Sequence, residues 1–325
     1  MVIPIYIVFI TFESIITNKI QYLHRGVSIT DIDKKIQDLK ECEKCSDIQI
    51  KKFSPLKDVI DIDKLNTDYM RCECGRRPLD IVMSHILKIM IESKIVSEKA
   101  SLRRNSPVPL SNFYYSNLNP QFIQKKTLIL LHPDFTKEVA EKIMGDVPEV
   151  ACILKGNPQN INGMCDINSK TNHFQILGGD DTQINVMRTI LGEKIIITKK
   201  QSIHHIEVAT TTEDKLVKLH NYITNNNIEK KVALDAMCGL GALGIYMSKL
   251  GFEKVIFNDI NPEMIDALKN NLKINNINNF EIRNDAFEDL KIDHVNLCVI
   301  DAFPAAEINE IIKKAEKIAD NVLVI

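Results

Sequence analysis

One stretch of the chain has the residue types and spacing of a nucleotide-binding turn. A short apolar run at residues 232–234 ends in Asp235, and the loop that follows contains Gly239 and Gly241. Apolar spacing typical of a helix resumes at residues 242–250. Because glycine has no side chain, backbone N–H groups in such a loop can approach a ligand at a helix N-terminus. The pattern predicts a strand, a tight turn and a helix that bind a nucleotide.

A second carboxylate lies at the distance expected for ribose binding. The apolar run at residues 255–257 ends in Asn258 and Asp259. A carboxylate at the tip of the second parallel strand can bind both hydroxyls of a ribose. With Gly244, the loop glycines also spell Gly-x-Gly-x-x-Gly, which is typical of pyrophosphate binding. These residues by themselves leave a dinucleotide and S-adenosylmethionine open as the cofactor.

Four cysteines near the N-terminus are spaced as metal ligands. Cys42 and Cys45 form one close pair, and Cys72 and Cys74, followed by Gly75, form a second. Each short loop can supply two thiolates to one ion, so the pattern predicts a structural zinc site with all four positions filled. Two alternatives stay open, because the second pair is tighter than a usual zinc knuckle: free, partly buried thiols, or an iron–sulfur cluster.

A basic stretch with aromatic residues follows the second cysteine pair. Between residues 71 and 130 there are ten Lys or Arg against four acids, and Arg103 and Arg104 lie within it. Cations for phosphates beside aromatic rings for unstacked bases are what RNA binding requires. The alternative is a solvated connector whose aromatic residues pack inward. These aromatic residues are Phe113, Tyr114 and Tyr115.

The elements that position these residues fall into several domains. At 325 residues and 45% apolar composition, the chain can bury more than one core. We predict an α/β protein whose doubly wound, Rossmann-like sheet follows a small α/β domain and a cysteine-rich, zinc-ribbon-like module. The expected boundaries are 1–77 for the N-terminal segment with the zinc module, 78–125 for a helix and basic connector, 126–211 for the small α/β domain and 212–325 for the nucleotide-binding domain.

Within these domains, periodicity and turn residues predict individual elements. Helices are expected at 27–41, from Pro78 onward, and at 136–144, 212–224, 242–250, 262–274 and 305–319; strands at 127–131, 150–154, 174–177, 194–198, 232–234, 255–257, 280–283, 295–300 and 321–325. Residues 178–181 are interpreted as a turn between two elements, with Asp180 or Asp181 as a helix cap rather than a catalytic acid, and His85 as a core histidine.

Composition and the start of the chain bear on the cellular compartment. Eight cysteines without a convincing export signal favour a reducing cytoplasm. The apolar run at the start has no preceding positive charge and is interrupted by Glu13, so it is too short to span a membrane. We interpret it as a buried strand or a misassigned start codon rather than a signal peptide.

Four motifs occur in the order and at the intervals of a known family. They read DAMCGLGALG, FNDINPEMIDALKNNLKINN, NDAFEDL and VIDAFP. In this respect the chain resembles class I S-adenosylmethionine-dependent methyltransferases, and the resemblance implies that cofactor. In that family a side chain of the third motif lies near the adenine ring. The expected cofactor-binding residues are Asp235, Gly239, Gly241, Asp259, Asp285 and Ala286.

Within this superfamily the chain is similar to enzymes that modify tRNA. NDINP and DAMCG resemble tRNA guanine-N2 dimethyltransferases, whereas the domain layout resembles tRNA guanine-N1 methyltransferases and related wybutosine-synthesis enzymes. The resemblance implies RNA, a tRNA purine, as substrate. Methyl transfer to a nitrogen needs an acceptor for the leaving proton, so Asp301 is the expected base, with Pro304 at the catalytic edge. The N1 enzymes read Asn-Leu-Pro where this chain reads Ala-Phe-Pro at residues 302–304. This difference leaves the target base open.

The chain stops after the fifth expected strand, whereas class I methyltransferases usually continue with two more. The sheet is therefore expected to lack its last strands, either as a fragment or because the N-terminal domain, a partner chain or self-association covers the exposed strand. Three alternative functions remain: aminocarboxypropyl transfer from the same cofactor, methylation of a small molecule, or a non-catalytic protein that binds RNA or a partner through a truncated methyltransferase fold.

Overall fold

The computed structural model describes residues 29–39, 42–46, 48–115, 121–160, 172–204, 209–302 and 308–325. It divides into two units, residues 1–38 and residues 39–325. In the first unit, the predicted amphipathic helix is α2 (Ile29–Asp38). The apolar start of the chain and Pro304 lie outside the described residues. No helix in the described ranges is long and apolar enough to cross a membrane.

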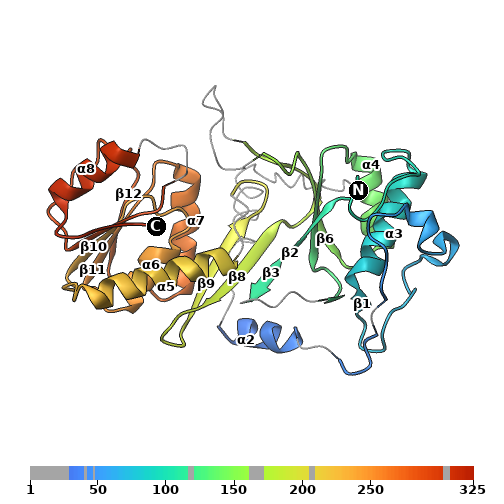
Figure 1. Cartoon of the computed structure of the whole chain (residues 1–325), viewed down its shortest axis with the longest axis horizontal. Helices are drawn as coiled ribbons and strands as arrows, with labels where there is room; N and C mark the ends of the chain where they lie inside the picture. Colours follow the sequence, from blue (N-terminus) through green and yellow to red (C-terminus); the bar gives the residue numbers. More distant parts are fainter. Residues whose placement is uncertain are drawn as a thin grey trace, which may run out of the picture. The chain divides into compact units, whose positions relative to one another are not determined.

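The C-terminal sheet has five parallel strands in the order β12-β11-β10-β13-β14 (Figure 1). The strand order reverses at β10, since β11 and β12 are added on one side of it and β13 and β14 on the other. Ligands of such sheets bind in the crevice outside the carboxyl ends of the strands at this reversal point. The strands are β10 (Val232–Asp235), β11 (Lys254–Asn258), β12 (Phe280–Arg283), β13 (Leu297–Ile300) and β14 (Val322–Val324).

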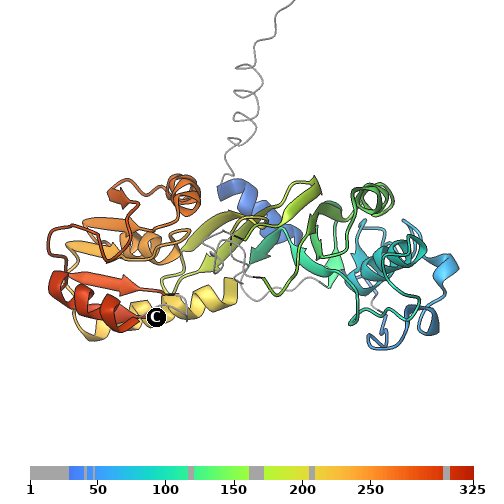
Figure 2. The same cartoon turned by 90° about the horizontal axis from the view of Figure 1, so that it is seen from above.

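Helices pack on both faces of this sheet, so it is doubly wound as predicted (Figures 1 and 2). On one face, α5 (Ala209–Asn225), α6 (Ala242–Lys249) and α7 (Pro262–Ile274) share a core with Phe257. On the other face, α8 (Ile308–Ile318) buries Ile311 and Ala315 against Leu234 and Ile256. Two local signals in the sequence set helix ends: Asn261 caps α7 through the Glu263 N–H, and Gly251 follows α6 with a left-handed φ of 94°.

The middle of the chain forms two further sheets. In the first, β5 (Leu128–His132) and β6 (Val150–Lys155) are parallel and joined by α4 (Lys137–Asp146), as predicted. They are flanked by the antiparallel strands β2 (Val108–Ser111) and β7 (Gln175–Gly179). The second sheet has the order β3-β8-β9, and its strands are β3 (Phe113–Tyr115), β8 (Thr182–Arg188) and β9 (Lys194–Lys200).

Three of these strands were not predicted, and one prediction in this region is wrong. Strand β2 contains a proline, β3 spans three residues, and β8 follows the pair of acids interpreted as a helix cap. The predicted turn is present between β7 and β8, but Asp180 caps no helix there; its Oδ1 accepts a hydrogen bond from the Thr182 N–H at 3.0 Å. An aspartate stabilises such a turn by the same bond with which it caps a helix, so the residue type alone did not separate the two.

The N-terminal part of the second unit is built around α3 (Leu79–Glu92), which begins after Pro78 as predicted. The short elements around it are η2 (Leu56–Asp58), η3 (Ile62–Lys64), β1 (Arg77–Pro78) and β4 (Phe122–Ile123). His85 on α3 is buried, and burial lowers its pKa to about 4. A histidine that stays neutral inside a helix interface agrees with its interpretation as a core residue.

Two buried asparagines, Asn271 of α7 and its C-cap Asn275, bind the edge of the second sheet. Asn271 Oδ1 accepts from the Thr198 N–H at 2.9 Å, and Asn275 exchanges two hydrogen bonds with the backbone of Ile196 at 3.0 and 2.7 Å. The asparagine side chains thereby pair backbone groups of β9 that would otherwise be left without a partner at the edge of the sheet. These bonds hold the second sheet against the C-terminal domain.

Candidate active site and metal centre

The loop after β10 turns on two glycines with left-handed backbones. Gly239 has a φ of 48°, and Gly241, the N-cap of α6, has a φ of 93°. A Cβ at Gly241 would come within 2.3 Å of Leu268 Cδ1, whereas a Cβ at Gly239 would meet nothing within 4 Å. Gly241 is therefore needed for packing, and Gly239 leaves the loop backbone open on the side where a ligand would bind.

Asp235, at the end of β10, is a buried carboxylate with one free oxygen. Its Oδ2 accepts from the Gly244 N–H at 2.7 Å, while Oδ1 is buried with no hydrogen-bond partner in the described part of the chain. Burial raises the pKa of Asp235 to about 7, against the opposing effect of the Gly244 bond. A buried acceptor without a donor is costly unless a ligand supplies one.

Asp259, at the end of β11, connects the two loops of the site. Its Oδ2 accepts from the Gly239 N–H at 2.8 Å and its Oδ1 from the Asn261 N–H at 2.9 Å. Burial raises the pKa of Asp259, and these two bonds oppose that shift. Each carboxylate oxygen retains a second lone pair, so Asp259 can still accept hydrogen bonds from the hydroxyls of a ligand.

Asn258 holds the loops around the site, a role that the sequence analysis missed. Its side chain is buried and donates to the carbonyls of Ala236 and Asp285, at 3.1 Å each, and accepts from the Asp285 N–H at 3.2 Å. One amide thus joins the ends of β10, β11 and β12. The signal available in the sequence was a polar residue at the end of an apolar strand. Asp285 itself is exposed and Ala286 half-buried on the loop that this amide fixes.

Asp301 follows β13 and is paired with a lysine from α5. Lys215 Nζ lies 2.7 Å from Asp301 Oδ2, and both side chains are about one-quarter exposed, at 24% and 25%. The strand topology places Asp301 at the same edge of the sheet as Asp235, because β10 and β13 are adjacent and parallel. The sequence offered no signal for Lys215, which lies on a helix predicted only as a linker.

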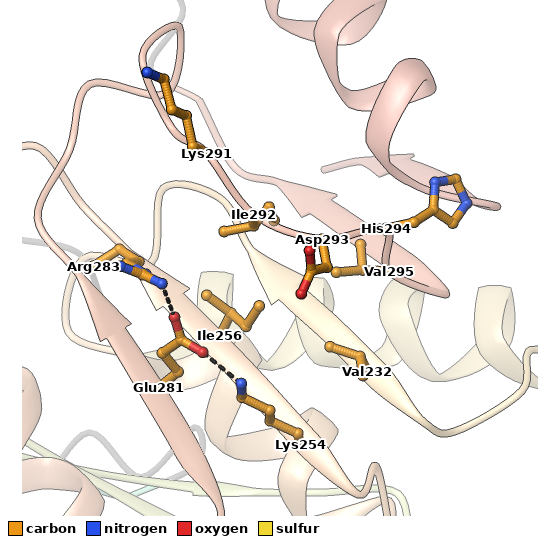
Figure 3. Close-up of a pocket in the computed structure, with 10 residues that line it drawn as sticks. All are labelled: Val232, Lys254, Ile256, Glu281, Arg283, Lys291, Ile292, Asp293, His294 and Val295. Atoms are coloured by element: carbon orange, nitrogen blue, oxygen red, sulfur yellow. Dashed lines mark hydrogen bonds and ion pairs between the residues drawn. The ribbon is translucent and has the colours of Figure 1, made fainter.

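Figure 3 shows a hollow at a different place on the same sheet, with a volume of about 410 Å³. It is lined by Val232 and Lys254, at the beginnings of β10 and β11, and by Glu281 and Arg283 of β12. The loops of the candidate active site follow the opposite ends of β10 and β11. In Figure 3, Glu281 points between Lys254 and Arg283 and is ion-paired with both, so these charges compensate one another.

The four predicted metal ligands lie together. The Sγ atoms of Cys42, Cys45, Cys72 and Cys74 are all within 4.8 Å of one another, and Cys45 Sγ is 3.6 Å from Cys74 Sγ. In a tetrahedral zinc site with bonds of about 2.3 Å, sulfurs lie roughly 3.8 Å apart. Both loops close in tight turns, since the Cys45 N–H donates to the Cys42 carbonyl at 2.9 Å and the Gly75 N–H to the Cys72 carbonyl at 2.8 Å. The donor set therefore fits zinc.

The aromatic triplet considered for RNA binding packs against the protein. Phe113 is buried in β3, and Tyr114 and Tyr115 are half-buried. Arg188 lies over the Tyr115 ring, with its guanidinium carbon 5.5 Å from the ring centre. This arrangement agrees with the alternative in which the aromatic residues pack inward. Arg103, by contrast, is exposed.

Comparisons with known proteins bear on the C-terminal domain. Residues 233–320 match a family described as a methyltransferase domain. A protein of Methanocaldococcus jannaschii that carries the name of a protein N5-glutamine methyltransferase is 33% identical over 86 residues, which are 26% of this chain and 42% of that protein. A tRNA (guanine(26)-N(2))-dimethyltransferase of Methanococcus maripaludis is 30% identical over 100 residues, which are 29% of this chain and 27% of that protein.

A solved structure of the tRNA m1G37 methyltransferase of Methanocaldococcus jannaschii aligns with 74% of this chain and 62% of its own, at 14% identity and a TM-score of 0.40. The chain spans less than half the length of the two curated relatives.

The family match, the parallel strand order and the glycine loop define the class of the C-terminal domain. It is a class I S-adenosylmethionine-dependent methyltransferase domain, with the Rossmann-like α/β fold that the four sequence motifs predicted.

Proposed function

We propose that this chain is a cytoplasmic S-adenosylmethionine-dependent methyltransferase that methylates a nitrogen of a tRNA base. The observation that carries the proposal is the edge formed by the ends of β10, β11 and β13. There, a buried carboxylate with a free oxygen, a second carboxylate bonded to the glycine loop and a third carboxylate paired with Lys215 lie at the ends of adjacent parallel strands.

The residues of this edge fit the cofactor by their chemistry. Asp235 Oδ1 is a buried acceptor for the cofactor's cationic amino group. Asp259 supplies acceptors for the ribose hydroxyls, and Gly239 and Gly241 form the loop between these two carboxylates. Asp285 and Ala286, on the loop held by Asn258, are proposed to contact the adenine ring.

The remaining task at the site is removal of a proton. Bound S-adenosylmethionine supplies a methyl group on a positively charged sulfur. A nitrogen that accepts this methyl group must lose its proton, and Asp301 is the proposed acceptor; Pro304, outside the described residues, is the second residue that we assign to the catalytic edge. Lys215 holds the Asp301 carboxylate through the 2.7 Å ion pair and so orients it.

Support for RNA as the substrate comes from relatives and from charge. The Methanococcus maripaludis relative is by name a tRNA dimethyltransferase, and residues 71–130 carry ten Lys or Arg against four acids. We assign residues 1–77, 78–125 and 126–211 to substrate binding and support, with zinc on the four cysteines as a structural ion, and residues 212–325 to catalysis.

The first experiment is calorimetric titration with S-adenosylhomocysteine. Wild type should bind, and Asp259→Ala should lose measurable binding, because both the ribose acceptor and the bond that holds Gly239 are removed. Asp266→Ala is the matched control, since Asp266 lies on α7 and is exposed. A wild-type protein that does not bind would overturn the cofactor assignment and favour a non-catalytic binding protein.

A second experiment identifies the acceptor. Purified protein is incubated with labelled S-adenosylmethionine and unmodified tRNA, and the nucleosides are analysed by mass spectrometry. A methylated nucleoside whose formation requires Asp301 supports the proposal. A heavier product would indicate aminocarboxypropyl transfer, and label only in small molecules or in protein would indicate another methyl acceptor; each of these results would contradict tRNA methylation. Protein is tested as an acceptor because the Methanocaldococcus jannaschii relative is by name a protein methyltransferase.

A further inference from the structure

Two turns of the N-terminal part lie side by side and form one surface. The first closes with the Ser54 N–H donating to the Lys51 carbonyl at 3.1 Å, and the second with reciprocal backbone bonds between Ser101 and Arg104 at 3.0 Å each. The Arg103 N–H donates to the Lys52 carbonyl at 3.0 Å and joins the turns. We call residues 51–54 and 101–105 the twin-turn surface.

Phe53 stands out of this surface. Its side chain is 70% exposed, whereas Leu56 and Ala100 beneath the turns are buried and linked by a backbone bond of 3.0 Å from the Leu56 N–H to the Ala100 carbonyl. The turn is thus anchored by its own core while the aromatic ring remains in water. A single exposed apolar side chain is ordinary on a protein surface, so its surroundings decide its meaning.

The surroundings of Phe53 are cationic. Lys51, Arg103 and Arg104 are exposed, and within the described part of the chain none of them forms an ion pair. Neighbouring lysines do find carboxylates: Lys52 Nζ lies 2.8 Å from Asp80 Oδ1, and Lys57 Nζ lies 3.5 Å from Glu98 Oε2. The three cations without an ion pair therefore belong to the same two joined turns as the exposed ring.

We propose that the twin-turn surface binds unpaired nucleotides of an RNA, with a base stacked on Phe53 and the backbone phosphates on Lys51, Arg103 and Arg104. Base stacking on an aromatic ring accepts any base, and cations beside the ring follow the strand, which is the arrangement of single-strand binding surfaces. A duplex hides its base faces and would use the cations alone. The inference rests on the proposed function for RNA as the substrate, and it names where and in which form that RNA is held.

The test compares single-stranded and duplex RNA of equal length by fluorescence anisotropy with the full chain. Phe53→Ala should weaken single-strand binding by roughly fivefold or more and leave duplex binding within about twofold, since stacking serves only unpaired bases. Leu191→Ala, which removes another exposed apolar side chain, is the matched control and should change neither.

The charge part is tested through salt. The double variant Arg103→Ala/Arg104→Ala should weaken binding to both RNAs and lower the slope of log affinity against log salt by about 1.4 for the single strand. The double variant Lys313→Ala/Lys317→Ala removes the same charge from α8 and should leave the slope unchanged.

Each outcome can be assigned. If Phe53→Ala weakens single-strand binding no more than Leu191→Ala, or if a polyglutamate peptide competes as well as RNA, the twin-turn proposal is wrong. If wild type binds S-adenosylhomocysteine but neither RNA, both the proposed tRNA substrate and the twin-turn proposal are wrong. If tRNA is methylated and the Phe53 variant methylates it with unchanged KM, only the twin-turn proposal fails. Unchanged thermal unfolding and S-adenosylhomocysteine binding of each variant exclude misfolding.

Discussion

Lys215 Nζ lies 2.7 Å from Asp301 Oδ2, and this contact joins the helix that precedes the methyltransferase sheet to the end of its fourth strand in sequence, β13. The two residues are 86 positions apart. A candidate proton acceptor is thereby held in one orientation by a residue that belongs to none of the four motifs.

The first prediction concerns this pair. Asp301→Asn should lower kcat by roughly 10²–10⁴-fold, because the amide cannot accept the leaving proton, while S-adenosylhomocysteine binding stays within about twofold. Lys215→Met should lower kcat less, and Lys215→Arg should restore much of the loss, since it keeps a cation beside the carboxylate. Single-turnover methylation kinetics and calorimetry make the measurement. An Asp301→Asn enzyme with wild-type kcat would remove Asp301 from the chemistry.

The second prediction is a pH dependence of stability set by Asp235. The folded protein keeps the proton of this buried carboxyl up to about pH 7, whereas the unfolded chain releases it near the ordinary value of 3.8. Between these values the folded state binds more protons, so this group lowers the free energy of unfolding as pH rises from about 4 to about 7, by at most about 4 kcal/mol.

Asp235→Asn isolates that contribution. The amide stays neutral, and its carbonyl can still accept from the Gly244 N–H. The free energy of unfolding, measured in urea from pH 4.5 to 8, should therefore fall less with rising pH in the variant than in wild type. Parallel curves for the two proteins would show that Asp235 ionises in the folded state as freely as in the unfolded chain.

The third prediction concerns a buried ion pair next to the cysteine loops. Arg77 and Glu149 are both fully buried, with Arg77 Nε 2.9 Å from Glu149 Oε1 and Nη2 2.6 Å from Oε2. Glu149→Ala should destabilise the protein by about 3–5 kcal/mol in urea unfolding, because it leaves a buried guanidinium without its partner. Lys64→Ala, which breaks the exposed pair with Asp61, should cost less than about 1 kcal/mol. Equal costs for the two variants would contradict the burial argument.

The fourth prediction is one zinc ion per chain. Elemental analysis of purified protein should find about one equivalent of zinc and little iron, and Cys45→Ser should reduce the zinc to below about half an equivalent. Cys298→Ala, a buried cysteine of β13, should keep its zinc. Cobalt substitution should add thiolate-to-metal absorption in wild type and in Cys298→Ala, and much less in Cys45→Ser. Iron with visible absorption as isolated would point to a cluster, and no metal at all to free thiols.

The fifth prediction separates two glycines by their surroundings. A Cβ at Gly244 would come within 2.2 Å of the Phe257 ring, so Gly244→Ala should destabilise the protein by about 1–3 kcal/mol. Gly145 on α4 has nothing within 4 Å of its Cβ position, and Gly145→Ala should be neutral or slightly stabilising. Urea midpoints of both variants measure this. A Gly244→Ala protein as stable as wild type would mean that the ring can move aside.

Much of the C-terminal domain follows from local patterns. The apolar runs that end in Asp235 and Asp259, the loop glycines and the Asn261-Pro262 cap are short-range signals. Parallel buried strands read as continuous apolar runs, and caps and glycines act within a few residues of themselves. The order of the five strands was not predicted, because local pattern does not specify which strands pair.

Tertiary structure decided the contacts between residues far apart in the chain. Spacing alone predicted two cysteine pairs, but only the fold brings all four sulfurs within 4.8 Å. The Lys215–Asp301 pair spans 86 positions, the Arg77–Glu149 pair spans 72, and the backbone bond from Arg103 to Lys52 joins the turn of Phe53 to a distant basic turn. A charge or an amide has no periodicity that reveals its partner, since its energy depends on distance and burial, and both exist only once the chain is folded.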